Sequence, residues 1–425
     1  MEVITFLKNI LWAPPLIILL FSAGILFTVR SGFYQFRCMS EMFRNISQSL
    51  RSSKTSGISS LMALSTALGG TVGVGSIIGV AYSIAIGGVG SIFWMWISGF
   101  IGMMTKYAEV AIAVKYRTKR KGIFVGGAMY ALKALGKPKT AVLFAITCVV
   151  ASVGAGNLAQ TNAIAELLSF EGVPITATAA VVAILLAFII FKGQKFIAKL
   201  SQIVVPFISV LYLLAVTAVI IVYFKGIPSA ICRIFSEAFG FSAVAGGFSG
   251  AIISSAFRNG LTKGVFSHEA GMGSSPIAHA ASETATPHTQ GLWGIFEVFF
   301  DTFVVSTLTA IAIICVGVCD MGELFDLFLG NAGSIFILAA IAVFAFAAVL
   351  SWCFYAESCL YFLSNSPVPL FIYRVLFIIA AFIGAVIPKG VAWDISDIFN
   401  ALMIFPNLFL LLICQKEVIK IIKLR

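Results

Sequence analysis

Two short glycine-rich segments contain residues whose types and spacing could bind a ligand through the backbone itself. Residues 69–76 read GGTVGVGS and residues 266–276 read FSHEAGMGSSP, so each contains a Gly-x-Gly-Ser core. Glycine inside a helix costs about 1 kcal/mol relative to alanine and proline about 3 kcal/mol, so we expect both segments to interrupt helices. An interrupted helix offers free N–H groups to an anion and free carbonyl oxygens to a cation. A zwitterion needs both, and hydroxyl groups added to the carbonyls would suit Na⁺.

The glycines also have a simpler interpretation. Gly69 with Gly73, and Gly75 with Gly79, fit the small-xxx-small pattern of closely packed helices. A nucleotide-binding fingerprint is excluded, because no soluble strand precedes either segment. What favours a binding site is repetition: the two cores lie 198 residues apart, and five predicted membrane spans begin at each. Broken helices in matching places of two oppositely oriented repeats indicate an inverted-repeat transporter with its site at the breaks.

Other polar side chains lie in apolar stretches and must face the protein interior, because an unpaired amide in lipid is costly. Asn157, Gln160 and Thr161 form one polar stripe at i, i+3 and i+4. Interhelical hydrogen bonding explains each of them as well as ligand contact does, and Gln160 has the longest reach. In the second glycine-rich segment, Glu269 could bind a ligand or tie down free N–H groups, and His268 is by default a packing residue.

Two pairs of charged residues inside apolar stretches have helical spacing. Lys106 and Glu109 are spaced i,i+3, and Glu297 and Asp301 are spaced i,i+4. We interpret both as structural pairing within the bundle, because intramembrane charges normally face inward and pair; an inner gate is the alternative. Neither the three histidines nor the eight cysteines have metal-ligand spacing. We therefore predict no enzyme, no catalytic residues, no cofactor, no metal beyond a coupling ion, and free, buried cysteines.

The elements that must position these residues are membrane helices. The 425-residue chain is 60% hydrophobic and 11% charged, whereas a soluble domain carries about 25% charged residues, so a soluble fold is excluded. The net charge of +11 lies in short runs without a continuous basic face, which favours lipid headgroups over nucleic acid as the partner. Windows of about 20 apolar residues predict about eleven spans: 11–29, 60–84, 88–114, 140–168, 174–191, 201–224, 246–284 (interrupted), 290–319, 333–363, 369–388 and 396–415.

Lysine and arginine predict the orientation of these spans. Of the 28 such residues, 21 fall in segments that are inside if the first span starts outside, and four fall in outer segments. We therefore expect a multi-pass protein of a bacterial or archaeal plasma (inner) membrane, with its N-terminus outside and its C-terminus cytoplasmic. The predicted organisation is an N-terminal helix with a basic segment (1–58), a first five-helix repeat (59–225) and a second repeat with a cytoplasmic tail (240–425). The sequence gives no sign of the oligomeric state.

These motifs together resemble those of the alanine/glycine:cation symporters, the sodium:alanine group of amino acid carriers. The resemblance covers almost the whole chain, and the block FSxEAGMGSxPIA is highly specific. The matching motifs are GTVGVG at 70–75, FWMW at 93–96, KYAE at 106–109, GN at 156–157 with Gln160, GVFSHEAGMGSSPIA at 264–278, DT at 301–302 and ISDIFN at 395–400 with Pro406 and Asn407. The resemblance implies an all-α polytopic fold: one extra N-terminal helix, then a 5+5 inverted-repeat core of the leucine-transporter type with two broken helices.

The resemblance also implies a function and a set of site residues. It implies secondary active import of a small neutral amino acid, such as alanine or glycine, by symport with Na⁺ through alternating access. The residues that would bind substrate are Thr71, Gly73, Val74, Gly75, Gln160, Phe266, Met272, Gly273 and Trp352. The residues that would bind Na⁺ are Gly69, Val72, Phe303, Ser306 and Thr307. Further functional candidates are Ser76, Asn157, His268 and Glu269.

The chain departs from the family pattern at both breaks. The family usually reads Thr-Gly-Asn where this chain has Val74, Gly75 and Ser76, and Ser-Asn-Glu where it has Ser267, His268 and Glu269. One hydroxyl and two amides are therefore missing. The alternative functions are H⁺-coupled transport, for which His268 could titrate near neutral pH, and gradient-independent facilitation of another small amino acid on the same fold.

Overall fold

The computed structural model describes residues 2–12, 14–51, 57–120, 122–239 and 249–424. Lys54, Arg425 and the predicted start of the second repeat at 240–248 lie outside the described residues. Helices make up almost all of the first half of the chain. Their bounds are α1 Glu2–Leu11, α2 Pro14–Arg30, α3 Tyr34–Arg37, α4 Met39–Arg51, α5 Ser60–Thr71, α6 Val74–Gly87, α7 Ser91–Lys115, α8 Ala128–Ala134, α9 Pro138–Val153, α10 Ala159–Phe170, α11 Ile175–Ile190 and α12 Gln194–Val222.

The second half is helical as well. Its bounds are α13 Ile227–Ala238, α14 Ser249–His268, α15 Pro276–Ala280, α16 Pro287–Val298, α17 Thr307–Val316, α18 Met321–Leu329, α19 Asn331–Leu363, α20 Val368–Val386 and α21 Lys389–Lys423. Two π-helical segments, η1 Gly154–Leu158 and η3 Phe299–Ser306, and a 3₁₀ turn, η2 Phe224–Gly226, join neighbouring helices. One antiparallel pair, β1 Thr118–Arg120 and β2 Ile123–Val125, follows α7.

Helix length and composition agree with a membrane protein. Within the described chain, eight helical segments are long and apolar enough to cross a bilayer, and Pro15–Arg30 and Ile175–Ile190 are shorter apolar helices. From Ser249 on, the predicted interrupted span corresponds to α14 and α15. On α12, apolar side chains such as Ile203, Phe207 and Leu214 are exposed, as expected for a helix that faces lipid.

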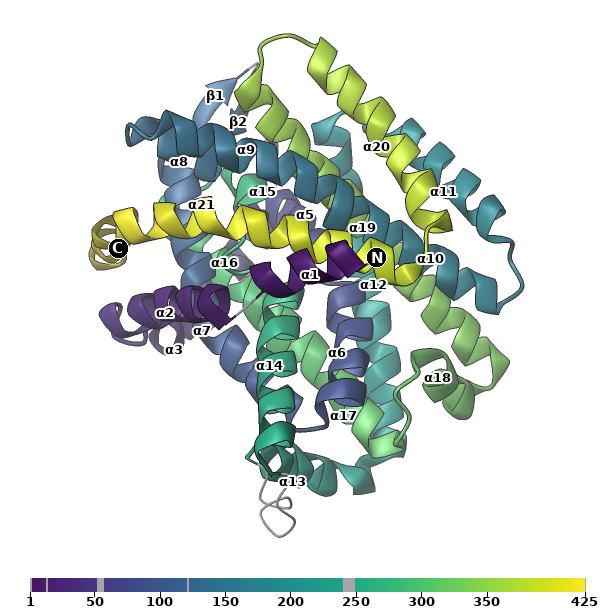
Figure 1. The fold of residues 1–425 in the computed structure, drawn as a ribbon. Helices are drawn as coiled ribbons and strands as arrows, with labels where there is room; N and C mark the ends of the chain where they lie inside the picture. Colours follow the sequence, from purple (N-terminus) through teal and green to yellow (C-terminus); the bar gives the residue numbers. More distant parts are fainter. Residues whose placement is uncertain (1, 13, 52–56, 121, 240–248, 425) are drawn as a thin grey trace.

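The helices form one bundle in which the two predicted broken helices lie near the middle (Figure 1). The α14 helix packs against α6 and α7, and α19 packs against α5, α9, α10 and α12. The N-terminal α1 lies along α21, which crosses the front of the view in yellow with the C-terminus at its left end. The β1–β2 pair lies at the opposite end of the bundle from α13.

The cysteines are only partly as predicted. None of the eight, all of which lie in the described part of the chain, forms a disulfide bond, and five of them are buried. Cys232 on α13 is exposed, and Cys315 and Cys319 are half-buried. The prediction of burial was wrong for these three, because they lie on or beside short connections at the end of the bundle that holds α13 and α18.

Candidate functional site

The first glycine-rich segment interrupts a helix by only two residues. The α5 helix ends at Thr71, Val72 is extended with φ −79° and ψ 115°, and α6 begins at Val74. Gly73 precedes α6, and its N–H donates to the Ser76 hydroxyl at 3.4 Å. The first N–H groups of a helix have no partner within that helix and carry its positive dipole end. The N-terminus of α6 is therefore an anion-binding end inside the bundle.

A small cavity, which we call the central cavity, lies beside this break. Seven of the nine predicted substrate residues line it, and Met272 and Gly273 do not. The lining residues that were predicted are Thr71, Gly73, Val74, Gly75, Gln160, Phe266 and Trp352. The cavity is also lined by Gly70, Ala155, Ala348 and Asn400, which were not predicted as substrate residues. Glu269 lines it too, although it was predicted only as a further functional candidate.

Besides Thr71, the polar side chains that line the cavity are Gln160, Asn400 and Glu269, each with oxygen that can accept hydrogen bonds. Gln160 is 7% exposed and Asn400 is 2% exposed. The side-chain oxygen of each is buried without a hydrogen-bond partner among the described residues. Glu269 adds a carboxylate, one oxygen of which accepts from the Ser274 hydroxyl at 2.5 Å. Asn400 could have been noticed in the sequence as an amide within an apolar helix.

The second glycine-rich segment is longer and its polar groups are used within the protein. It runs from Glu269 to Ser275, between α14 and α15. A single oxygen of Glu109 accepts from the N–H groups of Gly271 and Gly273 at 3.0 Å each, and from the Asn407 amide at 2.5 Å. Glu109 thus occupies the place that an anionic ligand would take at this break.

The backbone of the second break explains why glycines are needed there and why Gly273 is not in the cavity. Gly271 and Gly273 have φ of +99° and +78°, which other residues rarely adopt. A Cβ atom at Gly273 would lie 2.6 Å from the Asn407 side-chain oxygen. Gly273 therefore packs against α21 on the side where Glu109 and Asn407 hold the break.

A buried carboxylate–hydroxyl cluster lies next to the first break. Asp301 on η3 is fully buried, and its carboxylate accepts from Ser76 on α6, from Ser267 on α14 at 2.8 Å and from Thr302 at 3.2 Å. No lysine, arginine or histidine of the described chain makes an ion pair with it. An anion held in the bundle by hydroxyl groups alone is an oxygen-rich environment that suits a cation.

The five residues predicted to bind Na⁺ contact different parts of the protein. Gly69 on α5 faces Ser351 and the Ala347 carbonyl of α19. The Thr307 hydroxyl donates to the Thr302 carbonyl at 2.9 Å and accepts from the Trp96 indole at 2.9 Å. Val72 and Ser306 are buried, Phe303 is half-buried, and no described hydrogen bond joins Gly69 or Val72 to the η3 group. The Ser306 hydroxyl has no partner among the described residues.

Both π-helical segments carry residues of these sites. The sequence did not predict a π-helix at either place. The η1 segment places Ala155 at the cavity just before Gln160, and η3 carries Asp301 and Thr302. An added Cβ atom at Gly156 in η1 would overlap the Trp352 side chain. Single π-turns are frequent at functional sites because they redirect side chains within a continuous helix.

The buried charges do not pair as their sequence spacing suggested. Lys106 lies 3.4 Å from Glu297 and donates to the Ser275 hydroxyl at 2.7 Å. His279 contacts the other oxygen of Glu297 at 2.9 Å. Glu109 instead holds the second break. The expectation of structural pairing is confirmed for Lys106 and Glu297, which come from different helices and meet across the bundle interior. It is not met by Glu109 and Asp301, whose described partners are N–H, amide and hydroxyl groups.

Two further functional candidates have internal partners. His268 contacts the Ser98 hydroxyl at 3.0 Å through one ring nitrogen, and its other ring nitrogen accepts the Ala270 N–H at 3.1 Å. This arrangement matches the packing role expected by default. Asn157 donates to the Phe377 carbonyl at 2.6 Å and is fully buried. Neither residue lines the central cavity.

Near β1 and β2, hydrogen bonds tie together the segments that adjoin the two broken helices. The Glu283 N–H donates to the Ile58 carbonyl at 2.8 Å, and the Ser60 hydroxyl contacts that of Ser282 at 2.9 Å. The Arg117 guanidinium donates to the carbonyls of Ser282 and, at 2.9 Å, Ala285. Burial lowers the pKa of Arg117, but a guanidinium remains positive at neutral pH.

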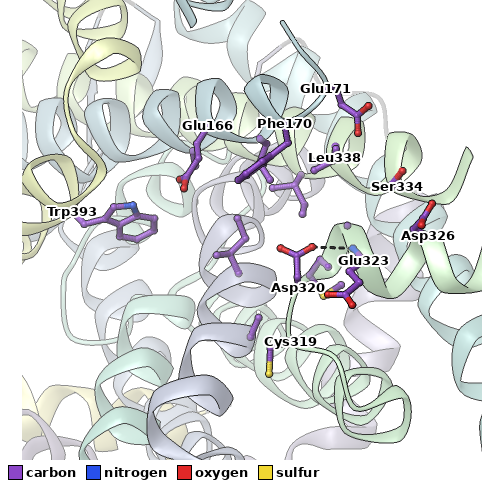
Figure 2. Close-up of a pocket in the computed structure, with 17 residues that line it drawn as sticks. Glu166, Phe170, Glu171, Cys319, Asp320, Glu323, Asp326, Ser334, Leu338 and Trp393 are labelled. Carbon is purple, nitrogen blue, oxygen red and sulfur yellow. Dashed lines mark hydrogen bonds between the residues drawn. The ribbon is translucent and has the colours of Figure 1, made fainter. Parts of the chain in front are cut away.

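The opposite end of the bundle carries an acidic pocket. Figure 2 shows a pocket with an empty volume of about 1390 Å³ whose lining carries five carboxylates and no basic side chain. The carboxylates belong to Glu166, Glu171, Asp320, Glu323 and Asp326. Trp393, at the left of the view, also lines a neighbouring pocket of about 850 Å³, which shares Gly75 and Phe266 with the central cavity.

Comparisons with known proteins agree with this arrangement. A family model described as the sodium:alanine symporter family matches residues 1–424. The chain is 38% identical to the sodium/alanine symporter AgcS of Methanococcus maripaludis, over 97% of this chain and 94% of that protein. It is 35% identical to the probable sodium/glutamine symporter GlnT of Bacillus subtilis, over 98% of this chain and 88% of that protein.

One similar solved structure supports the fold. It is the crystal structure of MhsT in complex with L-phenylalanine, with a TM-score of 0.55 at 16% sequence identity. The match covers 86% of this chain and 98% of that one. The fold is therefore of the leucine-transporter type, as expected.

Proposed function

Because this chain belongs to the sodium:alanine symporter family, we propose that it imports a small neutral amino acid, such as alanine or glycine, together with Na⁺ by alternating access. The observation that carries the proposal is the central cavity, which has a helix N-terminus at the first break and oxygen acceptors on other helices. The membrane would be the plasma membrane of a bacterium or archaeon, with the N-terminus outside.

The polarity of the cavity supports a zwitterionic ligand. The amino acid carboxylate would bind the N–H groups at the start of α6, where the helix dipole is positive. Its ammonium group would meet the oxygens of Gln160, Asn400 and Glu269. Each hydrogen bond to a charged group is worth about 1.5–3 kcal/mol when both partners are desolvated. Such a site would reject ligands that lack either charge.

The walls of the cavity support a small side chain. Phe266, Trp352 and Val74 line it, and an added Cβ atom at Gly75 would already lie 3.3 Å from the Ser267 backbone. Relatives of similar identity are named for alanine and for glutamine. The closeness of these walls therefore favours alanine, glycine or serine over larger substrates in this conformation.

The coupling ion is proposed to be Na⁺, with H⁺ as the alternative. The carboxylate–hydroxyl cluster of Asp301, Ser76 and Ser267 provides oxygen ligands directly beside the first break. The set implied by family resemblance, which includes Gly69, Val72, Phe303, Ser306 and Thr307, remains a second proposed location. A cation near Asp301 would hold α6, α14 and η3 together, which links its binding to the geometry of the cavity.

Alternating access would use the difference between the two ends of the bundle. The end near β1 and β2, which the charge distribution assigns to the cytoplasm, is tied by Arg117 and the contacts of Ser60 with Ser282. The opposite end is separated from the cavity by Phe266, whose ring lies 5.7 Å from that of Trp393. Substrate would enter past Phe266, and release would require the Arg117 contacts to break.

Uptake into proteoliposomes tests this function. Labelled alanine, glycine and serine should accumulate when an inward Na⁺ gradient is present and should equilibrate without it. Accumulation that follows a pH gradient alone would assign coupling to H⁺, and counterflow exchange without any accumulation would indicate a facilitator. The Asp301→Asn variant should lose Na⁺-driven accumulation, whereas the matched Asp326→Asn change on the exposed face of α18 should not.

A further inference from the structure

The pocket next to the central cavity has features of a binding site in its own right. It lies between α1, α6, α14 and α21 and has an empty volume of about 850 Å³. We call it the α1 pocket and define it by Lys8, Tyr82, Lys263, Trp393, Asp394 and Asp397. Gly75 and Phe266 line both this pocket and the central cavity.

The charges of the α1 pocket balance. Two lysines and two aspartates line it, so its formal net charge is zero. Lys8 lies 2.6 Å from Asp394 and 3.9 Å from Asp397. Although burial opposes the charge on Lys8, these two carboxylates raise its pKa. Lys8 therefore has its counter-ions within the protein and fastens α1 to α21.

Lys263 differs from Lys8 because it makes no ion pair within 4 Å among the described residues. Its ammonium group lies among aromatic rings, 4.8 Å from the centre of Tyr82, 5.5 Å from Phe266 and 5.9 Å from Trp393. The indole N–H of Trp393 is also buried without an acceptor among the described residues. Lys263 has no ion pair, the Trp393 indole N–H has no acceptor, and both residues line one pocket. Together they can bind a carboxylate.

We propose that the α1 pocket is a second binding site for the same amino acid, where the zwitterion is held before it enters the central cavity. Its carboxylate binds Lys263 and Trp393, and its ammonium group faces Asp397. This inference rests on the proposed function, because it concerns the same substrate on the same route. From here the carboxylate passes Phe266 to reach the N-terminus of α6 at Gly75.

The neighbouring acidic pocket explains why the ligand is a zwitterion and not a simple anion. That pocket shares Ile78 and Trp393 with the α1 pocket, and its lining carries carboxylates without a basic side chain. Its negative potential repels a net anion and leaves a molecule of zero net charge free to approach. The α1 pocket, with both signs of charge, then orients that molecule.

The Lys263→Met variant tests the proposal because it keeps much of the side-chain bulk and removes the charge. Alanine uptake should show a KM raised about tenfold with little change in kcat, because one charge-assisted hydrogen bond is worth roughly 1.5 kcal/mol or more. The equilibrium Kd of the central cavity, measured on the purified protein in nanodiscs, should stay as in the wild type. Lys263→Arg, which keeps the charge, should restore the KM.

Other results would overturn the proposal. An unchanged KM in Lys263→Met, or a loss confined to kcat, would mean that Lys263 acts in packing or gating only. If Lys263→Met does not fold, Lys263→Gln provides the same comparison. If lactate inhibits uptake by the wild-type protein as strongly as unlabelled alanine does, the α1 pocket binds anions in general. That result would contradict zwitterion binding. A wild-type protein that transports no amino acid would refute the proposed function itself, whatever Lys263 does.

Discussion

The two glycine-rich breaks share a Gly-x-Gly-Ser core but differ in what satisfies their free backbone groups. At the first break, two residues separate α5 from α6, and the start of α6 opens onto the central cavity. At the second break, Glu109 accepts the N–H groups of Gly271 and Gly273, and the Asn407 amide donates to Glu109 and to the Gly271 carbonyl. One break is thus available to a ligand, whereas the other is held by the protein.

This difference shows that a broken membrane helix is not by itself a binding site. The freed N–H and carbonyl groups must have partners at bilayer depth, but those partners can be a ligand or side chains of the protein. A buried carboxylate on a neighbouring helix decides between the two. Glu109 supplies that carboxylate to the second break, and no acidic side chain of the described chain is bonded to the N–H groups that begin α6.

The largest expected effect comes from filling the first break. Gly75→Leu should reduce alanine uptake at least about a hundredfold, since a loss of about 2.7 kcal/mol in binding already gives that factor. The leucine side chain would project toward Phe266 and Ser267 and occupy the cavity. Uptake should be measured in proteoliposomes and folding by size-exclusion chromatography. Near-normal uptake by a folded Gly75→Leu protein would remove Gly75 from the site.

At the second break we expect a loss of stability instead. Glu109→Gln weakens three hydrogen bonds to a charged acceptor and should destabilise the protein by about 2 kcal/mol or more. The melting temperature of the purified protein should fall clearly. The KM for alanine should change by less than about threefold, which corresponds to roughly 0.6 kcal/mol. A large rise in KM at unchanged melting temperature would show that the second break binds substrate after all.

The Gln160→Leu variant should show the opposite pattern. Loss of one hydrogen bond to a charged ligand group should raise the KM about tenfold or more. The melting temperature should fall less than in the control below, because the glutamine oxygen has no partner among the described residues and its NH₂ group donates only a long bond of 3.4 Å to the Ala155 carbonyl. Asn157→Leu is the matched control on the same helix stretch: it removes a bond to the Phe377 carbonyl and should lower stability. If both variants behave alike, Gln160 is structural.

The smallest effect is expected at His268, although it adjoins the second break. His268→Asn restores the residue usual in the family, and we expect uptake to change by less than about twofold, or roughly 0.4 kcal/mol. Its ring already contacts Ser98 and accepts the Ala270 N–H. The check is uptake at several external pH values. A variant that loses coupling to a pH gradient would make His268 part of the ion pathway.

Sequence reasoning could predict the features that depend on local composition. Long apolar windows predicted the helices, and the cost of glycine within a helix predicted both breaks. The polar stripe on the fourth span led to Gln160, which lines the cavity. Each of these follows from residues that are neighbours along the chain.

Features that depend on partners from distant parts of the chain could not be predicted. Glu109 was paired with Lys106 by its spacing, yet its partners Gly271 and Asn407 lie 162 and 298 residues away. Gly273 was predicted to bind substrate, but it packs against Asn407 of α21 and does not line the cavity. That contact too joins distant parts of the chain. The π-helical segments have no clear sequence signature, so the inward position of Asp301 next to Ser76 was not foreseen.

An experimental structure with bound alanine would test the central claim most directly. We predict that the alanine carboxylate lies within hydrogen-bonding distance, about 3 Å, of the N–H groups of Val74 and Gly75. Glu109 should remain bonded to Gly271 and Gly273. A carboxylate bound instead at Gly271 and Gly273, with Glu109 displaced, would contradict the distinction between the two breaks.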